Sequence, residues 1–176
     1  LFGTYVYPDG TEYIGDVKLI KNSITPHGKG TYYYPDGSEY NGEIRDGYQM
    51  GKGTMHNIDG SIIEGYFNKQ LYYGKCKITY PSGKYFVGEA TNSNGNIIHE
   101  GKCVSIFGDI YEGKFVNFNL EGHGKHYSKN KRLIYEGEFK NGLYNGKGTY
   151  HTTNKIYYEG HFKDNVKNGQ GLQRQG

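Results

Sequence analysis

Short segments in which aromatic and polar residues alternate around a glycine recur along the 176-residue chain. Alternation of this kind is typical of strands that expose one face. The glycines of successive segments, beginning with Gly15, Gly42 and Gly65, follow one another at intervals of 23 to 27 residues. The segments open at Tyr13, Tyr40, Ile63, Phe86, Tyr111, Tyr135 and Tyr158.

Two further signals complete the repeating unit, the first in every repeat and the second at four places in the first half of the chain. One is a glycine followed two residues later by Gly or Cys; these glycines are Gly28, Gly51, Gly74, Gly101, Gly122, Gly146 and Gly169. The other is a turn sequence such as Pro8-Asp9-Gly10, in which proline presets φ and glycine accepts a positive φ. A strand, a short loop, a second strand and a turn make a β-hairpin. The array therefore predicts an antiparallel meander.

The spacing within one unit also predicts how its two strands pair. In the segment from Tyr135 to Tyr150 we expect Gly137 opposite Gly148, Tyr135 opposite Tyr150 and Glu138 opposite Lys147. The same register elsewhere puts Gly42 opposite Gly53, Tyr40 opposite Met55 and Glu43 opposite Lys52. Facing glycines leave a bare strip of backbone, and glycine within a strand marks a close approach. Neighbouring rings, such as that of Phe139, can then lie on that strip.

The composition of the chain indicates whether the predicted sheet forms one layer or packs as two. Only 34% of the residues are hydrophobic and the mean hydropathy is −0.84, which is too polar for a thick two-layer core. With 20 tyrosines and 8 phenylalanines the chain is nevertheless rich in rings, unlike disordered sequences. We therefore expect a single-layer sheet whose rings cover its own backbone.

The stretch Tyr135–Tyr150, YEGEFKNGLYNGKGTY, closely resembles the MORN (membrane occupation and recognition nexus) repeat, and the resemblance extends over essentially the whole chain. It implies an all-β fold, an elongated single-layer antiparallel meander of tandem β-hairpins with the form of a solenoid-like rod. We expect one array over residues 1–176, with a half repeat at 1–12 and repeats starting near residues 13, 40, 63, 86, 111, 135 and 158. The array is expected to be a piece of a longer protein. The repeat at Phe86 departs most, because Ala90 replaces an aromatic residue and SNGNIIHEGKC is longer than the usual turn.

The resemblance also implies a function. Family members are mostly noncatalytic modules that act as scaffolds or adaptors at membrane-associated or cytoskeletal structures, so we expect protein–protein interaction or self-association and a cytoplasmic location. One alternative is a module that binds phospholipid headgroups; another is the regulatory arm of a larger enzyme, such as a lipid kinase or methyltransferase.

A row of rings is the predicted surface for a protein partner, because tyrosine is favoured at the centres of interfaces. A partner helix lying in the groove is one expected mode, and a homodimer formed through exposed sheet edges is another. Most of these rings are also expected to be structural. The candidate residues are Tyr13, Tyr40, Phe86, Tyr111, Tyr135, Phe139, Tyr150 and Tyr158.

A row of lysines is the candidate surface for anionic lipid, since each cation near a membrane surface adds to binding. These lysines are Lys29, Lys52, Lys75, Lys102 and Lys147. The competing interpretation, which we favour, is that carboxylates such as Glu43 pair with them across strands and neutralise the row.

Other chemistry is not predicted. The sequence has no nucleophile elbow, phosphate loop or HExxH motif, so we expect neither an enzyme nor a cofactor. Seven histidines lack the spacing of a metal site, and a net charge of +3 without a basic block gives no sign of nucleic-acid binding. Cys76 and Cys103 occupy equivalent places in adjacent repeats, about 10 Å apart, and are expected to be thiols.

Overall fold

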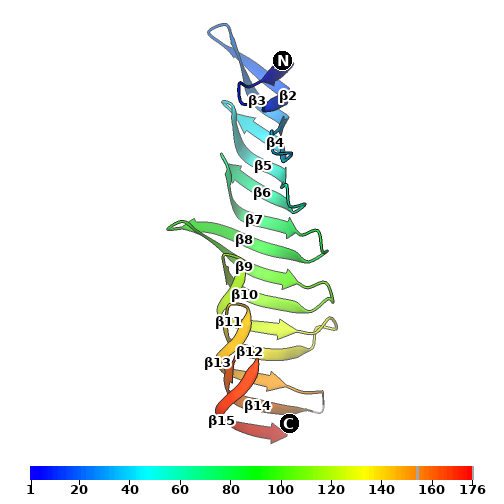
Figure 1. Ribbon diagram of the computed structural model, residues 1–176, viewed down its shortest axis with the longest axis vertical. Coiled ribbons are helices and arrows are strands. Elements are labelled where there is room, and N and C mark those ends of the chain that lie inside the picture. Colours follow the sequence, from blue (N-terminus) through cyan, green and yellow to red (C-terminus); the bar gives the residue numbers. More distant parts are fainter. Residues whose placement is uncertain (154, 176) are drawn as a thin grey trace. The chain divides into compact units, whose positions relative to one another are not determined.

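The computed structural model describes residues 1–153 and 155–175, and within those ranges every regular element is a β-strand. The chain forms two compact units, residues 1–82 (unit 1) and residues 83 onwards (unit 2). In each unit every strand pairs antiparallel with the next strand in chain order (Figure 1). Each unit is thus a single-layer antiparallel meander of hairpins, as predicted.

Among the residues that the structure describes, unit 1 contains seven strands and unit 2 contains eight. Those of unit 1 are β1 (Phe2–Val6), β2 (Glu12–Ile20), β3 (Ser23–Tyr33), β4 (Glu39–Arg45), β5 (Tyr48–His56), β6 (Ile62–Asn68) and β7 (Leu71–Thr79). Those of unit 2 are β8 (Tyr85–Ser93), β9 (Asn96–Val104), β10 (Ile110–Val116), β11 (Asn119–Tyr127), β12 (Leu133–Lys140), β13 (Leu143–His151), β14 (Ile156–Lys163) and β15 (Val166–Gln175).

A continuous row of glycines crosses each unit from strand to strand. In unit 1 the row is Gly3, Gly15, Gly30, Gly42, Gly53 and Gly65. In unit 2 it is Gly88, Gly101, Gly113, Gly124, Gly137, Gly148, Gly160 and Gly171. The predicted facing of Gly137 with Gly148 and of Tyr135 with Tyr150 is confirmed. The same holds for Gly42 with Gly53 and Tyr40 with Met55.

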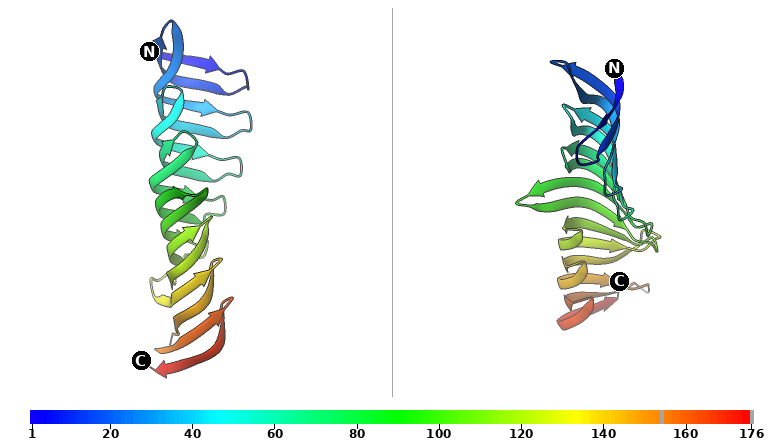
Figure 2. Two further views of the ribbon diagram at one scale, coloured as in Figure 1. Left: turned by 90° about the vertical axis from the view of Figure 1, so that its left-hand side faces the viewer. Right: turned by 45° about the horizontal axis from the view of Figure 1, so that its top comes forward.

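The predicted opposition of Glu138 to Lys147 is wrong, and so is that of Glu43 to Lys52. Past the glycine pair the register shifts, so that Phe139 faces Tyr144 and the second strand carries two residues more than the first. The first glycine of the Gly-Lys-Gly segment takes up this bulge; the φ of Gly146 is 100°. Bulges of this kind bend the strands that carry them, and Figure 2 shows the hairpins of each unit as curved ribbons.

At the bulges, a carboxylate side chain on the first strand of the hairpin accepts a hydrogen bond from a backbone N–H of the second strand. The backbone N–H of Lys147 donates to Glu138 Oε2 at 2.7 Å, and the N–H of Lys29 donates to Asp16 Oδ2 at 2.9 Å. The N–H of Lys52 donates to Glu43 Oε2 in the same way. In each case the carboxylate accepts a donor that the bulge has removed from the ladder.

Glu138→Ala should therefore lower the free energy of unfolding by about 1 kcal/mol, because the Lys147 N–H loses its acceptor. Chemical denaturation measures the change. Glu159→Ala, which removes an exposed carboxylate from the neighbouring strand β14, is the control and should have almost no effect. Equal effects of the two substitutions would contradict a role for Glu138 at the bulge.

The hairpin β8–β9 has no bulge, and this corrects the sequence alignment at that repeat. Gly101 faces Gly88, while Cys103 faces Phe86. Cys103 is therefore in the aromatic row, whereas Cys76 lies against the glycine row of unit 1 at Gly65, so the two cysteines are not equivalent. The segment expected to be a longer turn is a two-residue Asn-Gly turn followed by strand β9. The φ angles of Asn94 and Gly95, 49° and 79°, are those that such a turn needs.

Candidate functional site

Most of the aromatic residues predicted to meet a partner are buried. Tyr13, Tyr40 and Tyr135 have no exposed surface. Phe86, Phe139 and Tyr158 are also buried, while Tyr111 and Tyr150 are half-buried. Partner binding through this row stays a prediction. Because the other rings are buried, the residues of the row that a partner can contact are Tyr111 and Tyr150.

The buried tyrosines are held by the bulge and the glycine row together. The hydroxyl of Tyr135 donates to the carbonyl of Glu138 at 2.9 Å, and that of Tyr13 donates to the carbonyl of Asp16 at 2.6 Å. A Cβ added at Gly148 would lie 2.4 Å from Tyr135 Cζ, so the ring lies directly on that glycine. Burial, with the nearby carboxylate as a smaller cause, raises the pKa of Tyr13 and of Tyr135 to about 12.

These raised pKa values predict alkaline destabilisation. The unfolded phenols lose their protons near pH 10, whereas the folded ones keep them to about pH 12. Their contribution to stability is therefore complete below pH 10 and is lost as the pH rises toward 12. Urea unfolding at several pH values in this window should show the decrease. The double variant Tyr13→Phe/Tyr135→Phe should show a smaller one, and an unchanged pH dependence would contradict the assignment.

The reachable rings of unit 2 border a groove of about 500 Å³, which we call the unit-2 groove. The tip of hairpin β12–β13 forms one side, and strands β10 and β11 contribute the facing rings. The lining includes Tyr111, His126, Ile134, Leu143, Tyr144, Tyr150, Phe162 and Lys167. Leu143 is 36% exposed at the tip, so apolar surface is open at this groove.

A cluster of polar side chains, of which His126 and Tyr144 are buried, fixes the rings of the unit-2 groove. His126 Nε2 lies 3.0 Å from Asp109 Oδ2, and Nδ1 is hydrogen-bonded to the hydroxyl of Tyr144. With Nε2–H donating to the carboxylate, Nδ1 accepts from the hydroxyl. The Tyr111 ring stacks on His126 with centroids 4.2 Å apart, and Tyr135 stacks on Tyr144 at 3.8 Å. Burial raises the pKa of Tyr144, so its hydroxyl stays protonated and the cluster positions rings.

Unit 1 contains a smaller cavity of about 200 Å³, which we call the tyrosine pocket. Four tyrosines contribute to its lining, and the tips of hairpins β4–β5 and β6–β7 close it. The lining residues are Tyr7, Asp9, Thr11, Tyr32, Tyr34, Gly47, Tyr48, Gln49, Lys69 and Gln70.

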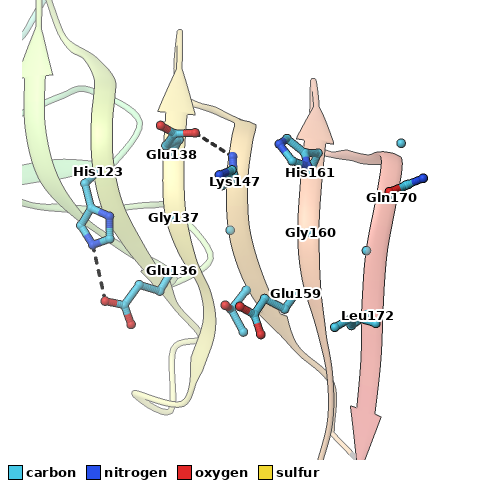
Figure 3. Close-up of a pocket in the computed structure, with 14 residues that line it drawn as sticks. His123, Glu136, Gly137, Glu138, Lys147, Glu159, Gly160, His161, Gln170 and Leu172 are labelled. Carbon is cyan, nitrogen blue, oxygen red and sulfur yellow. Dashed lines mark hydrogen bonds and ion pairs between the residues drawn. The ribbon is translucent and has the colours of Figure 1, made fainter.

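The opposite, polar face of unit 2 has a wide hollow of about 1000 Å³ (Figure 3). The backbone of the glycine row forms the floor of the hollow, because these glycines have no side chains to fill it. Glu136 pairs there with Lys125 at 3.7 Å and with His123 at 3.4 Å. Acidic and basic side chains both line the hollow, among them Glu138, Lys147, Glu159 and His161.

The predicted lysines do not form one row. Lys102 lies on the other side of the glycine row from Lys147, and its ammonium is 3.7 Å from Glu112. Lys29 faces Glu43 across the strand pair β3–β4, while Lys52 faces Tyr66. Lys75 is exposed on β7. Lys29 and Lys102 thus each have a carboxylate opposite or beside them.

The described residues contain no group of three or more His, Cys, Asp or Glu side chains placed to hold a metal ion. In the same part of the chain, no helix has the length and apolar character that crossing a membrane would need. Cys76 and Cys103 are both buried thiols.

Sequence reasoning missed His126, Tyr144 and Leu143 as parts of the groove, and Asp109 as the partner of His126. The positions of these side chains depend on how strongly the bulge bends the hairpin. Strand alternation does not specify that bend. The available signal was the position of Leu143 and Tyr144 just after the loop glycine Gly142, at a hairpin tip.

The MORN repeat family model matches residues 2–12, 25–39, 40–62, 135–155 and 158–174. No curated protein matches the chain at a significant level.

Two solved structures match the chain over nearly its whole length at low similarity. The TCP domain of SAS-4 (dCPAP) of Drosophila melanogaster, in complex with a proline-rich motif of Ana2 (dSTIL), is 12% identical with a TM-score of 0.39. The match covers 99% of this chain and 90% of that one. The G-box domain of the microcephaly protein CPAP is 12% identical with a TM-score of 0.31, and the match covers 99% of both chains. At these values the similarity says nothing of what this chain binds.

Proposed function

Since this chain is a MORN-repeat protein, we propose that it is a noncatalytic scaffold or adaptor whose unit-2 groove binds a segment of a partner protein. The observation that carries the proposal is a groove whose rim has the exposed Leu143 and the half-buried Tyr150, beside rings such as Tyr144 and Phe162 that are buried. Exposed surface of this kind marks interaction sites.

The groove suits the anchor side chains of an amphipathic helix. Its volume of about 500 Å³ accommodates a few apolar side chains, which is how a helix fills a hydrophobic groove. The stacks of Tyr111 on His126 and of Tyr135 on Tyr144 hold the rings in place before binding, so little conformational entropy is lost.

We also propose that the chain has no catalytic activity. Asp109, His126 and Tyr144 follow the order of carboxylate, imidazole and hydroxyl that can activate a nucleophile, but Tyr144 and His126 are both buried and their rings are held by stacking on Tyr135 and Tyr111. The cluster is better explained as a support for the groove.

Binding to anionic lipid is the weaker alternative. Lys102 is paired with Glu112, and Lys29 faces Glu43, so the lysines present a mixed-charge face. The proposed setting is the cytoplasm, at cytoskeletal or membrane-associated structures reached through the protein partner.

Affinity capture with matched variants tests the proposal. Leu143→Glu and Tyr150→Ala should each lose the partner that the unaltered protein recovers. Leu71→Glu, which changes the corresponding exposed tip residue of hairpin β6–β7, should keep it. Melting temperatures establish that each variant is folded. Recovery of the same partner by all variants would overturn the proposal, and a tagged and an untagged copy in one sample test self-association.

A further inference from the structure

The tyrosine pocket of unit 1 is separate from the unit-2 groove and has a different chemistry. Its aromatic lining comes from the turn after β1, from β3 and the turn after it, and from the start of β5. Tyr32 is buried, Tyr7 and Tyr34 are half-buried, and Tyr48 is 53% exposed at the rim. Four of the ten residues that line the cavity are thus tyrosines.

Hydrogen bonds at the ring edges hold these tyrosines in place. The Tyr32 hydroxyl donates to the carbonyl of Gly47 at 2.6 Å and lies 3.3 Å from the hydroxyl of Tyr7. The amide of Gln49, itself buried, donates to the hydroxyl of Tyr34. Because these hydroxyls are engaged within the protein, a ligand meets ring faces more than polar edges.

Two charged groups show which ligand the pocket favours. The ammonium of Lys69 lies over the Tyr48 ring, 4.9 Å from its centroid, so a cation already occupies one ring face. The Asp9 carboxylate, which accepts from the Thr11 N–H at 2.9 Å, also lines the cavity. Ring faces and a carboxylate together attract a cation.

We propose that the tyrosine pocket binds a methylated ammonium group on a lysine side chain of a protein, and that Lys69 competes for the same ring. A methylated ammonium matches the pocket better than an unmethylated one, because it needs fewer hydrogen-bond acceptors and can lie against the faces of the four tyrosines. A choline headgroup is less suitable, since its phosphate would lie close to Asp9. The proposal does not depend on the unit-2 groove.

Titration of the whole protein with a trimethyllysine peptide, followed by the tyrosine ring resonances, tests the proposal. The peptide should bind about fivefold more tightly than the same peptide carrying a neutral tert-butyl side chain of the same shape, which is the size of a cation–π contribution. Tyr48→Ala should weaken binding by about the same factor. Lys69→Ala should strengthen it, because the competing cation is removed.

Tyr33→Ala is the matched control, because Tyr33 is exposed on β3 on the face opposite to Tyr32 and should leave binding unchanged. Tyr48 and Lys69 are both exposed, so their variants should fold. Equal affinity for the charged and neutral peptides would overturn the proposal, as would loss of binding in Lys69→Ala. Preference for phosphatidylcholine vesicles over the peptide would overturn its assignment to a protein ligand.

Discussion

Tyr135→Ala should lower the free energy of unfolding by about 3–5 kcal/mol, the cost of removing a fully buried ring. The ring lies on Gly148 and stacks on Tyr144, so its removal leaves a cavity that a single layer has few side chains to fill. Chemical denaturation measures the loss. Tyr135→Phe keeps the ring and removes only the hydrogen bond to the Glu138 carbonyl, and should cost about 1 kcal/mol.

The exposed Tyr66, on β6 in unit 1, provides the comparison. Tyr66→Ala should change stability by no more than about 0.5 kcal/mol. If Tyr135→Ala were as mild as Tyr66→Ala, the buried rings would not form the core. The expected size of the effect also means that a loss of partner in Tyr135→Ala would report unfolding, so Tyr150 and Leu143 are the residues to change when binding is tested.

Gly53→Ala should destabilise the protein by about 1–3 kcal/mol through overpacking. An added Cβ would lie 2.4 Å from the hydroxyl oxygen of Tyr40 and 2.5 Å from its Cζ, closer than real side-chain contacts allow. Gly53 does not have a positive φ, so the substitution tests steric contact with the ring rather than backbone conformation. Thermal or urea unfolding gives the change.

Gly3→Ala is the control for this experiment. Its Cβ would meet Val17 Cγ2 at 3.6 Å, an ordinary contact, and alanine restricts the unfolded chain more than glycine does. We expect no loss of stability there. In addition, Gly53→Ala should cost less in a Tyr40→Ala background, because the clashing ring is gone. Full additivity of the two substitutions would contradict contact between Tyr40 and Gly53.

The sequence was sufficient to predict the strands and the glycine pairs. A ring, a glycine and a second glycine recur in fixed order, and only one register lets Tyr135 lie on the strip at Gly148. The bulge was not predictable in the same way, because the two extra residues near Lys147 can be placed either in a longer turn or in the strand. At β8–β9 the Asn94-Gly95 pair was a usable hairpin signal, and aligning Gly101 with the first glycine of other repeats obscured it.

The candidate site was less predictable for a physical reason. Strand alternation assigns Tyr135 and Tyr150 to the same face, but the hairpin tip with Leu143 and Tyr144 covers only one of them. The exposed fraction of each ring therefore depends on how strongly the bulge bends its hairpin. The partnership of His126 with Asp109 joins positions 17 residues apart and has no local signature.

The chemical shifts of the glycine Hα protons test most directly whether rings lie on facing glycines. In this structure Tyr135 lies on Gly148 and Tyr40 on Gly53, whereas nothing lies within 4 Å of a Cβ added at Gly142. The ring currents should move the Gly148 and Gly53 resonances well away from that of Gly142, and Tyr135→Phe, which keeps the ring, should preserve the Gly148 shift. Gly148 and Gly53 resonances at ordinary positions would contradict the account.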